Sequence, residues 1–135
     1  MYLLDTCVLS EGIRPQPDEN VDRWFRAQDS DVLFVSAMSA GELRYGIDRL
    51  QAGRKREALG RWFAETIVIG FAGRILAFDL SAASHWARIR SSQPNVGTVD
   101  SQIAATAIAN GFTLVTRNVK DFAFSGLSVF NPWNG

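Results

Sequence analysis

Short apolar runs alternate with longer stretches of helical periodicity along this chain. Between the runs, apolar residues recur at helical spacing, which predicts helices over about 19–28, after 41 to about 50, and across 83–89 and 103–109. Helices that separate consecutive strands favour a parallel sheet. We therefore expect an α/β fold, a three-layer α/β/α sandwich with a mostly parallel central sheet. The runs that we expect as its short buried strands span residues 2–4, 32–35, 74–78, 112–115 and 127–130.

One helix and strand near the C-terminal end organise this interpretation. Residues 103–109 are almost wholly apolar and rich in alanine, so their helix should be buried on most sides, and Gly111 supplies a left-handed turn at its end. The strand over 112–115 follows at once. Asp100 lies in the first turn of the helix, and Asp121 follows the strand. Because this helix runs antiparallel to the strand, we expect the two carboxylates on the same side of the sheet.

Two further acids follow predicted strands. Asp5 comes directly after the first strand and precedes a polar, proline-bearing loop that we expect to continue through Pro17. Taken singly, such an aspartate is more commonly a helix cap or a turn former. Glu42 follows the second strand and falls in the first turn of the predicted helix, where a glutamate usually does no more than complement the helix dipole. Their shared position after strands makes them candidates for a site.

Composition excludes several classes of protein. The chain has 135 residues, 47% of them hydrophobic, which indicates one domain over 1–135 with a substantial core. Its 14 basic and 14 acidic residues balance, so attraction to nucleic acid or membrane must come from a local patch. The single cysteine cannot form an internal disulfide, and no apolar run resembles a signal peptide or a membrane span. We expect a cytoplasmic protein without membrane contact.

One basic patch stands out between residues 44 and 61. It holds six of the 14 Lys and Arg residues, at spacings that place many of them on helix surfaces. A solvated helix face over apolar residues explains such a patch as well as a phosphate-binding surface does. The candidates for RNA contact are Arg44, Arg49, Arg54, Lys55 and Arg56.

Two other polar residues are assigned to structure. Asp79 precedes a helical pattern together with Ser81, so helix capping explains both. His85 is the only histidine, and no second His or Cys completes a zinc site with it.

Four carboxylates are thus expected at one edge of the sheet: Asp5, Glu42, Asp100 and Asp121. Like charges at close range repel and raise one another's pKa unless a cation lies among them. Oxygen ligands select Mg²⁺, with Mn²⁺ as a possible substitute, and such sites commonly act on phosphate esters by activating water. The predicted activity is phosphodiester hydrolysis, with the four acids as catalytic metal ligands. The polar residues expected to orient them are Thr6, Ser39, Thr116 and Asn118.

Four segments that carry these acids resemble the PIN-domain ribonucleases of the VapC toxin type. They span residues 2–10, 39–47, 100–107 and 114–122, and residues 130–133 look like the FitB-like branch. The resemblance covers the chain in order and places the family's acidic metal-binding set on the same four acids. Relatives often have a proline close to the third acid, whereas residues 95–99 here read Asn-Val-Gly-Thr-Val.

The resemblance implies the toxin of a type II toxin–antitoxin module, an Mg²⁺-dependent endoribonuclease. It also implies a homodimer that is held inactive by a VapB-type antitoxin, whose tail covers the active groove and often places an arginine near the acids. DNA is then contacted only through the antitoxin. Apolar residues such as Leu43 and Ile47 could line a dimer or antitoxin groove as readily as the core.

Two other functions fit part of the pattern. A non-catalytic binding module could use an acidic pocket to capture a partner's arginine, and metal would then compete with that partner. A phosphate-accepting receiver domain also collects acids at strand ends. It needs one acceptor aspartate with a lysine nearby, and Lys120 beside Asp121 fits that arrangement poorly.

Overall fold

The computed structural model describes residues 1–135 and contains one five-stranded sheet in the order β3-β2-β1-β4-β5. Every pair of neighbouring strands is parallel, with Leu3 opposite Leu114 and Leu4 opposite Val115 at the centre. The expected α/β class and the parallel sheet are confirmed. The strands are β1 (Tyr2–Leu4), β2 (Leu33–Ser36), β3 (Ile75–Leu76), β4 (Thr113–Val115) and β5 (Val129–Phe130).

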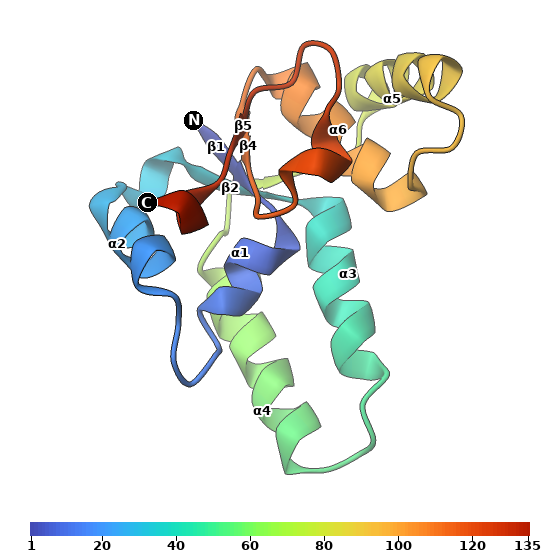
Figure 1. Ribbon diagram of the computed structural model, residues 1–135. Helices are drawn as coiled ribbons and strands as arrows, with labels where there is room; N and C mark the ends of the chain where they lie inside the picture. Colours follow the sequence, from blue (N-terminus) through green and yellow to red (C-terminus); the bar gives the residue numbers. More distant parts are fainter.

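Helices cover both faces of this sheet, and α3 and α4 extend from it as a hairpin (Figure 1). None of the helices is long and apolar enough to cross a membrane. The α-helices are α1 (Thr6–Glu11), α2 (Glu19–Ala27), α3 (Ala37–Asp48), α4 (Arg54–Trp62), α5 (Leu80–Ser92) and α6 (Thr98–Asn110). A π-helix, η2 (Phe63–Ile69), continues α4, and the 3₁₀ turns are η1 (Ser30–Val32), η3 (Val119–Phe122) and η4 (Pro132–Asn134).

The alternation of side chains along β1 produces the layers. Leu3 is fully buried against α5 and α6, in a cluster that includes Ile89 and Ile103. Leu4 is fully buried on the opposite face, in a second cluster with Val8 of α1 and Ile67 of η2. Successive residues of a strand point to opposite faces, so two adjacent leucines supply the centre of both cores. The expected three layers are therefore present.

Two expectations about local structure were wrong. The segment after Asp5 was expected as a loop, but it forms α1, because Val8 and Leu9 bury their side chains on the sheet and Asp5 caps the helix. Glu42 was expected in the first turn of its helix. The helix begins earlier, at Ala37, because Ser36 caps it by accepting the backbone N–H of Ser39 at 2.9 Å, which places Glu42 in the second turn.

Other local expectations are confirmed. Gly111 ends α6 in the left-handed conformation, with φ of 69°. Asp79 caps α5 by accepting the backbone N–H of Ala82 at 2.9 Å, but the expectation that Ser81 also caps was wrong, because Ser81 lies inside that helix. Ile47 is buried, so it belongs to the core of this chain.

Candidate active site

Asp5 lies at the carboxyl end of β1 and is 4% exposed. Its Oδ1 accepts the backbone N–H of Thr6 at 2.9 Å, and its Oδ2 accepts the hydroxyl of Thr116 at 2.7 Å. The capping role of this aspartate and its role as a candidate ligand are therefore compatible. Longer contacts from the Thr6 hydroxyl to Oδ1, at 3.5 Å, and from the Cys7 thiol to Oδ2, at 3.6 Å, add to these two hydrogen bonds.

Asp100 and Asp121 line one pocket of about 490 Å³, although 21 positions separate them in the chain. Asp100 is half-buried in the first turn of α6, and Asp121 is exposed in η3, after β4. The loop between α5 and α6 closes one side of the pocket, and Lys120 also lines it. The helix thus returns Asp100 to the side on which β4 ends.

Glu42 lies on α3. It lines a second pocket, of about 420 Å³, together with Thr6 and Lys55. Its side chain is largely exposed, and no residue of the chain forms an ion pair with it.

The pKa values connect the four acids. Partial burial raises the pKa of Glu42, and the charges of Asp5 and Asp100 raise it further. Partial burial likewise raises the pKa of Asp100, with further contributions from Asp5 and Asp121. Each of the four carboxylates therefore acts electrostatically on at least one of the others. The expectation of one site for all four acids stays a prediction, since only Asp100 and Asp121 line the same pocket.

No Lys or Arg forms an ion pair with these four carboxylates, although Lys120 and Lys55 line the pockets that hold three of them. The three ion pairs of the structure join Arg14 to Glu11, Arg26 to Asp22 and Arg44 to Asp48, all outside it. At the same time, no three His, Cys, Asp or Glu side chains are close enough to hold a metal ion together. The acids thus influence one another electrostatically without forming a closed set of ligands. Their oxygen donors and uncompensated charge fit a hard divalent cation.

Of the polar residues expected to orient the acids, two contact Asp5 directly, Thr6 and Thr116. Asn118 reaches it indirectly, since its backbone N–H donates to the Thr116 hydroxyl at 3.1 Å. Ser39 does not touch an acid, because it is fully buried and its hydroxyl bonds that of Ser36 at 3.0 Å.

The residues of the predicted basic patch do not gather at one place in the structure. Lys55 lines the pocket of Glu42. Arg44 pairs with Asp48 and lies over the ring of Phe63, and it shares a separate pocket of mixed charge with Arg56. Arg49 lies over the ring of Tyr45, and Arg54 begins α4.

Sequence reasoning missed Cys7. Its Sγ lies 3.6 Å from Oδ2 of Asp5 and 3.6 Å from the Thr116 hydroxyl, and it accepts the backbone N–H of Arg117 at 3.5 Å. Burial raises the pKa of this thiol. The signal was its place two residues after Asp5, which became meaningful only once α1 was known to be a helix.

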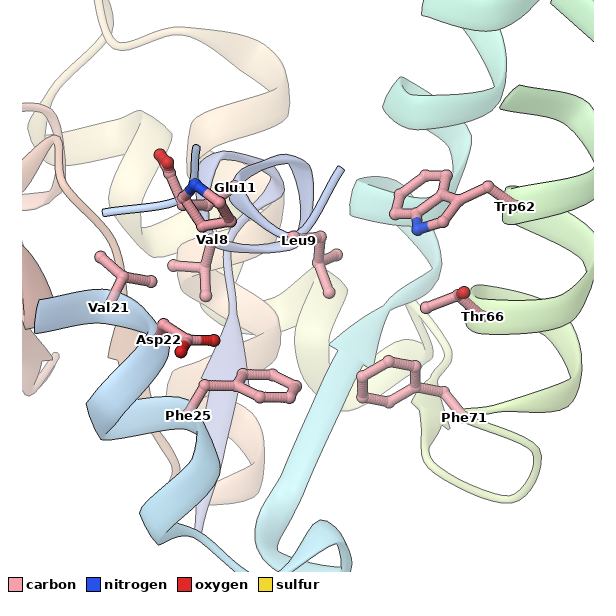
Figure 2. Close-up of a pocket in the computed structure, with 11 residues that line it drawn as sticks. Val8, Leu9, Glu11, Val21, Asp22, Phe25, Trp62, Thr66 and Phe71 are labelled. Carbon is pink, nitrogen blue, oxygen red and sulfur yellow. The ribbon is translucent and has the colours of Figure 1, made fainter. Parts of the chain in front are cut away.

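A further pocket lies away from the acids, between α1, α2 and the α4–η2 segment (Figure 2). It has a volume of about 340 Å³, and the rings of Phe25 and Phe71 face each other across it. Glu11, which is 3% exposed, also lines it and is paired with Arg14 at 3.0 Å. None of the four candidate acids lines this pocket.

Comparison with known proteins places this chain in one family. The sequence matches the PIN domain family over residues 2–123. Toxin FitB of Neisseria gonorrhoeae is 40% identical over 99% of both chains, and the VapC ribonuclease Y4jK of Sinorhizobium fredii is 37% identical over 98% of both. A solved structure of FitAB bound to the IR36 DNA fragment superposes with a TM-score of 0.90 at 39% identity, covering 98% of this chain and 96% of that one. This chain therefore belongs to the PIN domain family, in the branch that contains the VapC and FitB toxins.

Proposed function

We propose that this chain, as a single nuclease domain over residues 1–135, is the toxin of a toxin–antitoxin module and a divalent-metal-dependent endoribonuclease. The observation that carries the proposal is a group of four carboxylates without an ion-pair partner, in which Asp100 is coupled electrostatically to each of the other three. The ribonuclease and toxin names of relatives at 37% and 40% identity support it.

The residues that would hold the ion are Asp5, Glu42 and Asp100, while Asp121 would hold a second ion or its water molecules. Mg²⁺, or Mn²⁺ in its place, supplies an activated water molecule and neutralises phosphate charge. Burial and a short hydrogen bond from Thr116 hold the Asp5 carboxylate in one orientation. Lys120 lines the pocket of Asp100 and Asp121, where its charge would attract a phosphodiester.

The raised pKa values of Glu42 and Asp100 would make metal binding depend on pH. Protons compete with the cation at Glu42 and Asp100 more effectively than at ordinary carboxyls, since their pKa values lie above the usual range. Metal binding would therefore weaken as pH falls.

The partners follow from the family. We expect a VapB-type antitoxin to inhibit the toxin and to provide any contact with DNA, in keeping with the relative FitAB, which was solved bound to a DNA fragment. We expect a homodimer, as the resemblance to the VapC-type toxins implies. The cytoplasm, where RNA lies, is the proposed place of action.

Cleavage of total RNA in Mg²⁺, with EDTA as the metal-free control, tests the proposal. The wild type should cut RNA, and Asp100→Asn should lose at least about 100-fold in rate, because it removes a ligand charge. Asp22→Asn is a matched control, since Asp22 is an exposed acid in an ion pair with Arg26 and should keep its rate. An arginine-capturing module would cleave nothing under any of these conditions, and activity in EDTA would also contradict the proposal.

A further inference from the structure

A second, basic pocket adjoins the pocket of Asp100 and Asp121. It has a volume of about 350 Å³ and is lined by His85 and Arg88 of α5 and by the turn at Ser125 and Gly126. Gln93 and Phe124 line both pockets, so the two pockets are adjacent. A polymer bound at the acids can therefore extend to the basic pocket.

The donors of this pocket have no partner within the chain. Arg88 is exposed and takes part in none of the three ion pairs, and neither its guanidinium nor the His85 ring forms a hydrogen bond. The turn closes through the N–H of Leu127 on the carbonyl of Phe124, at 3.2 Å, and leaves the N–H groups of Ser125 and Gly126 without an acceptor. Arginine and unpaired backbone N–H groups are the usual donors to an anion.

The neighbouring arginine shows the contrast. Arg90 donates to the carbonyl of Val96 at 2.8 Å and thereby fixes the loop that borders the acidic pocket. The Arg88 side chain holds no such loop, because it forms no hydrogen bond or ion pair. No Asp or Glu lines the basic pocket, so its charge is not compensated locally, although it adjoins the acids.

We propose that the pocket of His85 and Arg88 binds a phosphate of the RNA strand beyond the cleavage point. This inference rests on the proposed ribonuclease function and adds a site to it. A nucleic acid that reaches the acids must carry further phosphates along its strand, and the adjacent pocket offers those phosphates one set of free donors. His85 then has a role beyond packing, and the strand is guided by α5 as well as by the patch on α3 and α4.

Binding of a fluorescent single-stranded RNA in EDTA, followed by anisotropy over a range of salt concentrations, tests the pocket without catalysis. Arg88→Gln should raise Kd about five- to tenfold and reduce the slope of log K against log salt by about 0.7, the value for one lost phosphate contact on a single strand. His85→Ala should weaken binding in the same direction. In cleavage assays, Arg88→Gln should raise KM and leave kcat near the wild-type value.

Arg23→Gln is the matched control, because Arg23 is an exposed arginine on α2 and lines neither pocket. Equal Kd and salt slope for Arg88→Gln and Arg23→Gln would overturn the inference, even if the wild type cleaves RNA. So would a variant that loses only antitoxin binding, since the pocket would then serve a protein. A wild type that neither binds nor cleaves RNA would overturn the proposed function and this inference together.

Discussion

The Thr116 hydroxyl donates a 2.7 Å hydrogen bond to Oδ2 of Asp5, across 111 positions of the sequence. Both residues are buried, and they follow the adjacent parallel strands β4 and β1. The backbone N–H of Asn118 donates to the same hydroxyl at 3.1 Å, so Thr116 also holds the start of the segment that leads to Asp121. One hydroxyl thus connects two of the strands that present the candidate acids.

Thr116→Val should therefore reduce both activity and stability. It removes the donor to Asp5 and the acceptor for Asn118 inside a buried site, which costs about 1–3 kcal/mol in the free energy of unfolding. Thr116→Ser keeps the hydroxyl and should retain most of the cleavage rate. Urea denaturation and RNA cleavage measure the two effects. A Val variant as active as the Ser variant would show that the hydroxyl does not position Asp5.

The raised pKa values of Glu42 and Asp100 predict how stability depends on pH without metal. Because both carboxyls hold protons more tightly in the folded protein, folding takes up protons between their ordinary pKa, near about 4, and their raised values. Their contribution to the free energy of unfolding is therefore present at low pH and decreases as pH rises through that window. Asp100→Asn should gain stability relative to the wild type over the same window.

Urea denaturation in EDTA at several pH values measures this difference, and saturating Mg²⁺ should abolish or reverse it. The prediction would be contradicted if, in EDTA, the wild type became more stable relative to Asp100→Asn as pH rises.

A buried carboxylate outside the site gives an independent prediction. The Glu11 side chain is 4% exposed and its ion-pair partner is Arg14, whose side chain is 60% exposed. Arg14→Ala should destabilise the protein by about 1–2 kcal/mol, because it leaves a buried charge without a partner. Arg26→Ala breaks a pair whose side chains are 78% and 48% exposed and should cost less than about 0.5 kcal/mol. Equal losses in urea denaturation would contradict the effect of burial.

Gly111 provides a test of the fold alone. Its φ of 69° ends α6 before β4, so Gly111→Ala should cost about 1 kcal/mol in the free energy of unfolding. Gly46 lies inside α3, and a Cβ there meets nothing within 4 Å. Gly46→Ala should stabilise the protein by about 0.5–1 kcal/mol. Opposite signs in thermal or urea unfolding are the expected result, and a stabilising Gly111→Ala would contradict the assigned turn.

The sequence was most informative where local pattern and tertiary burial agree. The alanine-rich helix with its glycine stop and the short strands were predictable because α6 is buried along most of its length and each strand is apolar. The segment after Asp5 was predicted incorrectly because Pro15 and Pro17 mark a loop. The apolar residues that make α1 a helix act only through packing on the sheet.

The site shows the same limit. Positions after strands were enough to select Asp5 and Asp121, since the carboxyl ends of parallel strands share an edge. Contacts between distant segments produce three other features: the hydrogen bond of Thr116 to Asp5, the contacts of Cys7, and the burial of Ser39. No spacing along the chain encodes those contacts.

Calorimetric titration of the RNA-free protein with Mn²⁺ tests the central claim, that the four acids hold a divalent cation. The wild type should bind the ion, Asp5→Asn and Asp100→Asn should lose at least about tenfold in affinity, and Asp22→Asn should bind as the wild type does. A wild type without measurable binding, or equal binding by all four proteins, would contradict it.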